Sequence, residues 1–298
     1  MNTRMTRPRR SALYMPGANA RALAKARSLD ADVLIMDLED AVAPEAKAVA
    51  REQVAATLAA GGYGRRELVV RINGLDTPWG ADDLAAVARM PADAVLLPKV
   101  EDGPQLRASI QRLDQAGGGR LPVWVMAELP QAVLAIDAIA SLAPRVAVIV
   151  MGTADLGRAL RLPADPSRLG LLPALGQCLL AARARGLDIL DGIFTDLHDE
   201  PGLRAACQQG KALGFDGKTL IHPAQIATAN DCFGVSAAEA AAAASVVAAW
   251  EAAAAAGQGI AVLDGRMVER LHAEEARRLL GLHAACSVEA GDPDRNRE

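Results

Sequence analysis

Residues 123–155 read VWVMAELPQAVLAIDAIASLAPRVAVIVMGTAD, and this stretch contains one full repeat of the fold followed by the next strand. Two runs of consecutive apolar residues, 123–126 and 146–151, each end in a polar loop, and a helical period lies between them at 132–141. Apolar residues at consecutive positions are typical of strands that are buried on both faces, as in parallel sheets. The stretch therefore predicts a strand, a helix and a second strand parallel to the first.

The same unit recurs along most of the chain. Apolar runs lie at residues 12–15, 33–36, 68–72, 94–97, 123–126, 146–151, 187–190 and 215–221. Helical periods lie at residues 20–29, 46–60, 80–90, 103–116, 132–141, 173–185 and 200–213. Eight β-then-α units in succession predict a closed (β/α)8 TIM barrel. A doubly wound open sheet is the alternative, but no G-x-G-x-x-G motif opens the first helix and the unit count in this length matches a barrel.

The chain departs from this repeat near Ser236. We therefore expect a catalytic barrel domain over residues 1–235 and a C-terminal lid or oligomerisation segment over residues 236–298. The segment begins with an Ala-rich helix at 237–256 and continues through residues 257–265 into a charged helix at about 266–280. Gly257-Gln258-Gly259 is the expected flexible joint between the two helices. Such an Ala-rich helix needs a surface to cover, so we expect a homo-oligomer, a trimer or hexamer, in which the segment crosses to a neighbouring subunit. The alternative is a segment that folds back on its own barrel.

The composition is that of a globular protein with a large core. The chain has 298 residues, of which 51% are hydrophobic, and a formal net charge of −4. This charge argues against a nucleic-acid partner, because phosphate binding requires a clustered basic excess. No stretch reaches the roughly 18 uninterrupted apolar residues of a membrane span, so we expect no membrane partner. The four cysteines form no C-x-x-C pair, which is typical of reduced thiols in a cytoplasmic protein.

The first ten residues are basic and include Arg4, Arg7, Arg9 and Arg10. They lack the apolar segment of a secretory signal. Short basic runs at a chain end are usually solvated and disordered, and this is what we expect here.

Polar side chains follow six of the predicted strands, at the end of a barrel where active sites lie. They occur in Asp37-Leu38-Glu39-Asp40, Arg71-Ile72-Asn73, Pro98-Lys99-Val100-Glu101, Ala127-Glu128, Gly152-Thr153-Ala154-Asp155 and His222-Pro223. Any single acid in such a place is as often a helix N-cap as a functional group. So many charges at one end of a buried sheet require compensation, however, and a bound cation together with Arg71 and Lys99 would supply it.

Glu128 and Asp155 form the best candidate pair of metal ligands. Each lies just past a predicted strand, and the two strands are consecutive. Two carboxylates leave most of an octahedron to water and substrate, which is how Mg²⁺ is usually held. The four histidines are scattered and no His/Cys cluster would select Zn²⁺. The pattern therefore predicts Mg²⁺, or Mn²⁺, at this pair.

These residues also carry a resemblance to a known family. The blocks SALYMPG (11–17), DLEDAV (37–42), RIN (71–73), LPKVE (97–101), GTADL (152–156) and GFDGKTLIHPAQI (214–226) occur in the family order. Together they resemble the HpcH/HpaI aldolase–citrate lyase β-subunit family, from about residue 10 to about residue 280. Within it, the chain is similar to the branch that contains malyl-CoA and citramalyl-CoA lyases.

The resemblance implies Mg²⁺-dependent cleavage of a carbon–carbon bond in a 3-hydroxyacyl-CoA thioester, which yields acetyl-CoA and a 2-oxo acid. It places the metal ligands on Glu128 and Asp155 and the substrate arginine on Arg71. Asp37, Glu39, Asp40 and Lys99 are the remaining candidates for substrate binding. Two alternatives stay open: a thioester hydrolase on the same scaffold, or a non-catalytic subunit that only binds acyl-CoA or an acyl-carrier thioester.

The chain departs from the family pattern at two places. The metal glutamate is commonly followed by threonine, whereas Leu129 follows Glu128 here. The segment GRMVE at 265–269 resembles the lid motif in which lyases carry a catalytic aspartate, but this chain has Glu269 at that position and no proline after it. Glu269 is therefore the expected proton-transfer group, and Asp264 is the second candidate.

Overall fold

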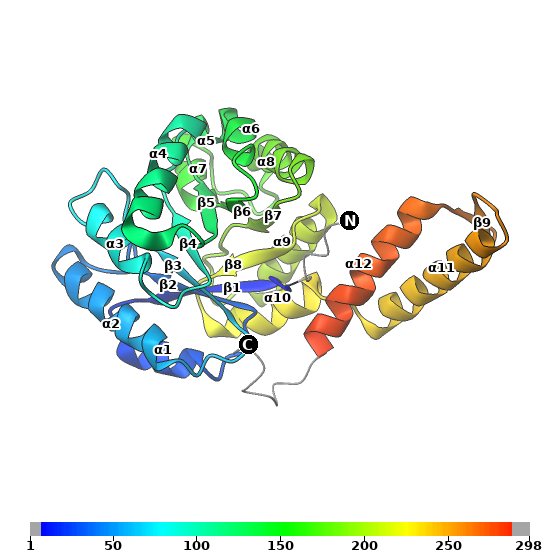
Figure 1. Ribbon diagram of the computed structural model, residues 1–298, viewed down its shortest axis with the longest axis horizontal. Coiled ribbons are helices and arrows are strands. Elements are labelled where there is room, and N and C mark those ends of the chain that lie inside the picture. The colour runs from blue at the N-terminus through cyan, green and yellow to red at the C-terminus, as the bar shows by residue number, and fades with distance from the viewer. Residues whose placement is uncertain (1–6, 288–298) are drawn as a thin grey trace. The chain divides into compact units, whose positions relative to one another are not determined.

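Eight parallel strands close a barrel in chain order, with β8 hydrogen-bonded to β1 (Figure 1). The computed structural model describes residues 7–287. The strands are β1 (Ser11–Pro16), β2 (Val33–Asp37), β3 (Glu67–Arg71), β4 (Ala94–Leu97), β5 (Val123–Ala127), β6 (Val146–Met151), β7 (Asp188–Asp191) and β8 (Gly217–Leu220). Each strand overlaps an apolar run of the sequence, and the predicted TIM barrel is confirmed.

Helices follow the strands and cover the outside of the barrel (Figure 1). They are α1 (Ala20–Ala26), α2 (Lys47–Ala60), α3 (Gly80–Val87), α4 (Gly103–Leu113), α5 (Pro130–Leu134), α6 (Ile136–Ala140), α7 (Thr153–Ala159), α8 (Leu172–Ala184), α9 (Glu200–Leu213) and α10 (Ile226–Phe233). Short 3-10 turns lie at Pro44–Ala46, Leu169–Leu171 and Pro223–Gln225, and a π turn lies at Asp114–Gly118. The helix expected at 132–141 is divided at Ala135. Helices α7 and α10 were not predicted from the helical periods of the sequence.

The barrel interior explains why the site forms where it does. Alternate residues of each strand point inward, and on β2, β3 and β5 buried apolar residues such as Ile35, Val69 and Met126 fill the centre. The next inward position on each of these strands, two residues further along, belongs to the same face. Those positions are occupied by the polar residues Asp37, Arg71 and Glu128. Three strands therefore deliver charged side chains to the same mouth of the barrel.

The opposite end of the barrel is closed by arginines from the N-terminal segment. Arg9 donates hydrogen bonds to both carboxylate oxygens of Glu67, at 2.7 and 2.8 Å, and to Asp188. Its guanidinium also lies 5.2 Å from the ring centre of the buried Trp124. Arg10 donates two side-chain hydrogen bonds to Asp32. The expectation of a disordered basic tail is therefore wrong for these two arginines, and Arg4 lies outside the described residues.

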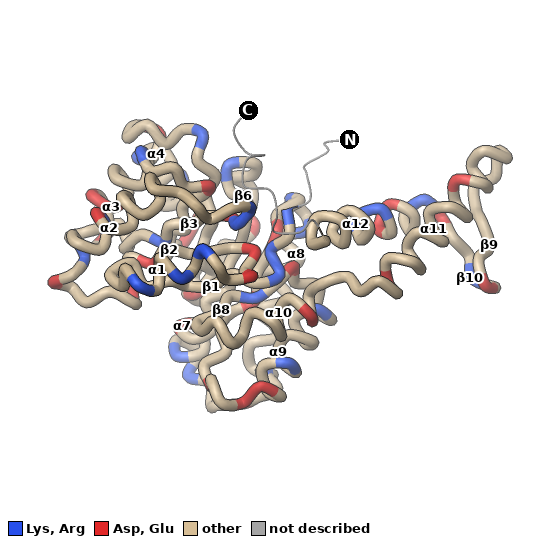
Figure 2. Tube along the Cα trace, turned by 90° about the horizontal axis from the view of Figure 1, so that it is seen from below, with Lys and Arg blue, Asp and Glu red and all other residues tan. Residues whose placement is uncertain are grey.

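Residues Arg9–Cys232 form one compact unit, and the residues from Phe233 onward belong to a second. The second unit contains α11 (Ala237–Ala255), β9 (Ala261–Leu263), β10 (Arg266–Val268) and α12 (Arg270–Ser287), and the two helices pack along each other. Most of α11 carries no charged residue, whereas α12 carries several of both signs (Figure 2).

An antiparallel hairpin joins the two C-terminal helices, where the sequence suggested the start of a helix. Asp264 and Gly265 form its turn, with φ angles of 49° and 75°. Two consecutive positive φ angles are characteristic of a type I′ turn, for which Asp-Gly is a preferred pair. Gly257, with a φ of 74°, follows the end of α11. The expected helix start at about residue 266 is therefore wrong, because residues 266–268 form β10. The flexible joint expected at residues 257–259 precedes the hairpin and stays a prediction, as does the role of this unit as a lid.

The helical stretch Pro223–Ala255 is long and apolar enough to cross a membrane by length and composition alone. This is weak support for a span, because residues 234–236 interrupt the helix and both Glu239 and Glu251 lie within it. The expectation that the protein has no membrane partner stays a prediction.

Candidate active site

A cavity of about 300 Å³ opens at the C-terminal ends of the barrel strands. One part of its wall is polar and is formed by Asp37, Asp40, Arg71, Glu128 and Asp155. The other part is formed mainly by the larger side chains Tyr14, Met126, Met151, Ile193 and Ile221. Active sites of TIM barrels lie at this end, and charged groups predicted from four different strand ends line the cavity. Lys99, from a fifth strand end, contacts Glu128 and Asp155. The cavity is therefore the candidate active site.

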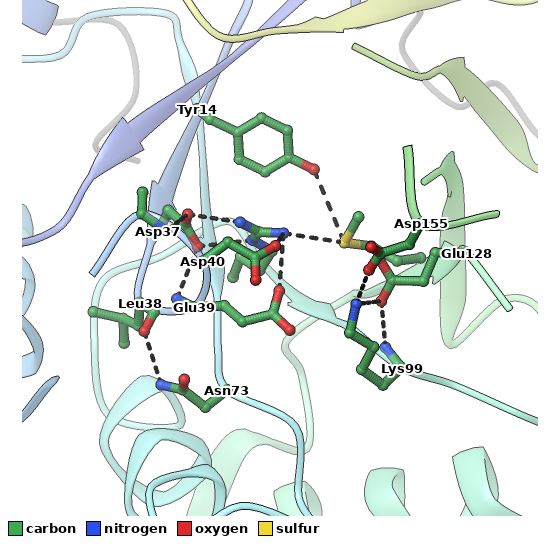
Figure 3. Close-up of polar contacts among 12 residues, drawn as sticks. Tyr14, Asp37, Leu38, Glu39, Asp40, Asn73, Lys99, Glu128 and Asp155 are labelled. Carbon is green, nitrogen blue, oxygen red and sulfur yellow. Dashed lines mark hydrogen bonds and ion pairs between the residues drawn. The ribbon is translucent and has the colours of Figure 1, made fainter. Parts of the chain in front are cut away.

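Arg71 is the central cation of the cavity. Its Nε and Nη2 atoms donate to the two carboxylate oxygens of Asp37 at 2.7 and 2.6 Å (Figure 3). Its Nη1 atom lies 2.9 Å from Glu39 and 3.2 Å from Asp40, and the ring of Tyr14 lies 4.7 Å from the guanidinium carbon. Burial by itself lowers the pKa of Arg71, but the adjacent carboxylates hold the pKa well above its ordinary value. Arg71 is thus a permanently charged and rigidly oriented group.

The acidic loop after β2 is held by Asn73 and by two groups that the sequence did not single out, Lys47 and Asp83. The buried ammonium of Lys47, on α2, donates to the backbone oxygens of Leu38 and Glu39 at 2.9 and 2.7 Å. Asn73 donates to the Leu38 oxygen at 2.8 Å and to the buried carboxylate of Asp83 at 2.6 Å. Asn73 therefore positions the loop through its backbone and does not line the cavity. No sequence motif marks Lys47 or Asp83, because both lie in ordinary helical periods.

Glu39 has an unusual environment for a carboxylate. It is only 8% exposed, and its Oε2 atom makes no hydrogen bond although it lies 2.9 Å from Arg71. Burial, with a further contribution from the negative charge of Asp40, raises the pKa of Glu39 to about 8, even though Arg71 acts in the opposite direction. A buried carboxylate whose hydrogen bonds are incomplete takes up a proton readily. Glu39 is therefore a proton-carrying group near neutral pH.

Glu128 and Asp155 both contact the ammonium of Lys99. Glu128 is 2% exposed and accepts the backbone N–H of Lys99 at 2.7 Å, and the Lys99 ammonium lies 3.3 Å from the same oxygen. The ammonium also donates to Asp155 (Figure 3). Burial raises the pKa of Glu128. Burial opposes ionisation of Asp155 too, but the hydrogen bond and charge of Lys99 outweigh it and lower the pKa of Asp155.

The backbone near Asp155 leaves the space that the Glu128 side chain occupies. Asp155 lies in the first turn of α7 and is not its N-cap, which is Gly152. A Cβ atom at Gly152 would overlap the Cβ of Glu128 and lie 3.0 Å from its Oε2 atom. Only glycine therefore leaves room for Glu128 in its present position. Leu129 is the N-cap of α5 and supplies no side-chain hydrogen bond there.

The carboxylate pair fits a hard divalent cation. A single ammonium already contacts both groups, so one cation can bridge them. Within residues 7–287 no group of three His, Cys, Asp or Glu side chains is arranged to hold a metal ion. Two carboxylates with open positions for water and substrate are what Mg²⁺ accepts, whereas a closed structural zinc site needs four ligands.

The remaining predicted residues lie elsewhere. His222 is the N-cap of the turn at Pro223–Gln225, where its ring accepts the backbone N–H of Ala224, which is a structural role. Asp264 lies in the turn of the C-terminal hairpin, and Glu269 directly precedes α12. Both belong to the second unit, so their catalytic roles stay predictions.

Comparisons with known proteins show to which family the chain is similar. The family described as HpcH/HpaI aldolase/citrate lyase matches residues 10–223. The chain is 49% identical to a (3S)-malyl-CoA thioesterase of Cereibacter sphaeroides strain KD131 over 273 residues, which cover 92% of this chain and 94% of the thioesterase. It is 37% identical to the citrate lyase subunit beta of Escherichia coli strain K12 over 286 residues, which cover 94% and 95% of the two chains.

A solved structure is similar over a comparable length. Protein CitE from Mycobacterium tuberculosis, in complex with magnesium, acetoacetate and coenzyme A, is 29% identical with a TM-score of 0.74. The match covers 92% of this chain and 97% of that one. The magnesium and coenzyme A belong to that protein.

Proposed function

Since the chain belongs to the HpcH/HpaI aldolase/citrate lyase family, we propose that it is a Mg²⁺-dependent enzyme that hydrolyses the thioester bond of a malyl-CoA-type substrate. The observation that carries this proposal is the 49% identity with a (3S)-malyl-CoA thioesterase over almost the whole chain, against 37% for a citrate lyase subunit beta. The sequence motifs favoured a carbon–carbon lyase and kept the thioesterase as the alternative. The identities support the alternative better than the lyase.

Glu128 and Asp155 are the proposed ligands of Mg²⁺, or of Mn²⁺ in its place. The proposal is supported by their shared contact with one ammonium and by the hard oxygen chemistry of the pair. When bound, the ion would act as a Lewis acid that polarises an oxygen atom of the substrate.

Arg71 is the proposed binding group for the substrate carboxylate. Asp37 occupies one edge of the guanidinium, so Nη1 is the atom that faces other acids. Asp40 has a side chain that is 68% exposed, and an anionic substrate group can take its place at Nη1 without breaking the pair with Asp37. Asp37, Glu39 and Asp40 thus orient the arginine, and Lys99 provides a second positive charge for the anionic substrate.

Hydrolysis requires a water molecule and a proton acceptor. The water oxygen forms a bond to the thioester carbon, the carbon–sulfur bond breaks, and the water proton passes through a base to the leaving thiolate. Glu269 is the proposed base and Asp264 the second candidate, as the family resemblance implies. A base from outside the barrel is supported by the state of three carboxylates inside it. Asp37 and Asp155 are already engaged with Arg71 and Lys99, and the raised pKa of Glu39, about 8, favours its protonated form at neutral pH.

The proposed setting is that of a cytoplasmic homo-oligomer, a trimer or hexamer, that acts on CoA thioesters. Coenzyme A in a structural relative supports the choice of carrier over an acyl-carrier protein. We propose neither a nucleic-acid nor a membrane partner.

The test is a product analysis of purified protein with malyl-CoA and Mg²⁺. A hydrolase releases malate and a free thiol, which a thiol reagent detects directly. A lyase releases glyoxylate and acetyl-CoA and leaves no free thiol. Glu128→Gln is the control for the metal site and should stop thiol release while the fold persists. Glyoxylate formation without free thiol would replace the proposed hydrolase by the lyase, and turnover by neither route would leave a binding subunit.

A further inference from the structure

We propose that Lys99 is an exchange cation: its ammonium bridges Glu128 and Asp155, a divalent metal displaces it, and the displaced ammonium then binds an anionic group of the substrate. This inference rests on the metal site of the proposed function. It adds one step to metal ligation: binding of the metal releases the Lys99 ammonium, which can then bind the substrate.

The first observation is the position of the ammonium. Lys99 Nζ lies 3.3 Å from Glu128 Oε1 and is hydrogen-bonded to Asp155 Oδ2, so it uses one oxygen of each carboxylate. A Mg²⁺ ion held by both carboxylates would lie about 2.0–2.1 Å from an oxygen of each, and therefore very near the ammonium that these carboxylates already hold. Two cations cannot share them at such short range, because like charges repel strongly where the surroundings are only partly solvated. Metal binding therefore has to expel the ammonium.

The second observation is the backbone of Lys99. Its φ angle is 51°, a left-handed conformation that is uncommon for residues other than glycine and asparagine. In this conformation its N–H reaches Glu128 at 2.7 Å while its side chain extends to the carboxylate pair. The backbone is thereby anchored to Glu128 independently of the ammonium. The side chain is 32% exposed, so it can leave the carboxylates without any shift of the strand end.

The third observation is the balance of charge. Glu128, Asp155 and Lys99 together carry a net negative charge, which opposes an anionic substrate. Addition of a divalent cation makes the same group of side chains net positive. The freed ammonium remains within one side-chain length of the cavity, because its own backbone stays bonded to Glu128. The metal thus converts this group of three side chains from one that repels carboxylates and thioester oxygens into one that attracts them, which predicts that metal binds before substrate.

The first experiment measures Mn²⁺ binding by calorimetry at one fixed pH for the wild type, Lys99→Met, Glu128→Gln and the exposed control Lys25→Met. Methionine keeps the length of the side chain and removes its charge. Lys99→Met should bind Mn²⁺ about tenfold more tightly than the wild type, since the resident competitor is gone. Malate binding to the metal-loaded protein should be about tenfold weaker in the same variant. A merely structural role for Lys99 would weaken both.

The second experiment measures the rate at which Lys99 is acetylated, by a short pulse of acetic anhydride and peptide mass spectrometry. Its main comparison is between wild-type protein with and without Mg²⁺, so this result does not depend on the folding of a variant. Mg²⁺ should raise the acetylation of Lys99 several-fold by releasing it from its ion pairs, and should leave Lys25 unchanged. In Glu128→Gln the ion should have no effect.

The outcomes separate this inference from the metal assignment. If Glu128→Gln binds Mn²⁺ as well as the wild type, the metal site is elsewhere and the exchange is refuted with it. If Glu128→Gln loses the metal while Lys99→Met binds it no better than the wild type, or Mg²⁺ leaves Lys99 acetylation unchanged, the metal site stands and the exchange is refuted.

Discussion

At the scale of single residues, the guanidinium of Arg71 determines how the cavity treats an anion. Arg71→Lys would lose the paired hydrogen bonds to Asp37, because an ammonium cannot match both carboxylate oxygens. Hydrogen bonds to charged groups contribute about 1.5–3 kcal/mol each, so we expect kcat/KM to fall by roughly 10- to 100-fold. Steady-state kinetics with Mg²⁺ measure the loss. Near-normal kinetics would leave Arg71 as a structural partner of Asp37, Glu39 and Asp40.

Glu39 should make the stability of the protein depend on pH. Its pKa of about 8 in the folded protein lies above the ordinary value of 4.5, so the folded protein keeps a proton that the unfolded chain has lost between these values. The stabilisation from this group is therefore complete below the lower value and is lost as the pH rises through the higher one. In Glu39→Gln that loss is absent.

We therefore expect the free energy of unfolding of Glu39→Gln, relative to the wild type, to rise from about pH 5 to about pH 9. Urea unfolding with a metal chelator present measures it. Glu101→Gln, at an exposed position near the same rim, is the matched control and should show no such trend. A constant difference between Glu39→Gln and the wild type over this range would contradict the raised pKa.

At the scale of elements, the junction between β6 and α7 sets the position of Glu128. A methyl group at Gly152 overlaps Glu128, whereas one at Gly157, in the same helix, meets no atom within 4 Å. We expect Gly152→Ala to lose about 1–3 kcal/mol of stability through overpacking and to bind Mg²⁺ more weakly. Gly157→Ala should be neutral or stabilising by up to about 1 kcal/mol, as alanine favours a helix.

Thermal unfolding and Mn²⁺ calorimetry on the Gly152→Ala and Gly157→Ala variants test this prediction. Equal behaviour of the two alanines would mean that Glu128 can move aside at no cost, and that β6 and α7 do not determine its place.

Helix α2 has a comparable part in holding the loop after β2. The Lys47 ammonium donates to two backbone oxygens of that loop, and Asn73, in the segment after β3, donates to one of the same oxygens. Buried carbonyl groups without partners are costly, so these contacts restrict the loop to one conformation. Glu39 and Asp40 therefore contact Arg71 from a loop whose backbone is held in place.

At the scale of the whole molecule, the prediction concerns which subunit supplies the C-terminal acid to each active site. If residues 236–298 cross to a neighbouring subunit and Glu269 is catalytic, each site combines Arg71 of one copy with Glu269 of another. A mixture of Arg71→Ala and Glu269→Ala proteins should then regain activity, up to about a quarter of the wild type for random mixing. The measurement needs two inactive parents and independent proof of subunit exchange. An inactive mixture under those conditions would show that the unit serves its own barrel.

Much of the barrel could be predicted from local patterns alone. Buried parallel strands produce continuous apolar runs, and inward positions two residues apart carry the series Ile35–Asp37, Val69–Arg71 and Met126–Glu128 toward one end. The hairpin at residues 261–268 could also have been predicted, since Asp264-Gly265 between apolar residues is a turn signal. Helix α7 was not predicted, because its first turn contains residues 153–155, which the sequence marks as a polar loop after a strand.

The sequence by itself determined that eight βα units form a barrel and that Glu128, Asp155 and Arg71 stand at its mouth, because strand burial and strand-end position are local properties. Only the tertiary structure decided how these groups pair. It joined Arg71 to Asp37, supported their loop with Lys47 and Asp83, and set Lys99 between Glu128 and Asp155. The physical reason is that such contacts depend on which strands are neighbours, on their relative register and on backbone angles at single residues, none of which leaves a periodic trace in the chain.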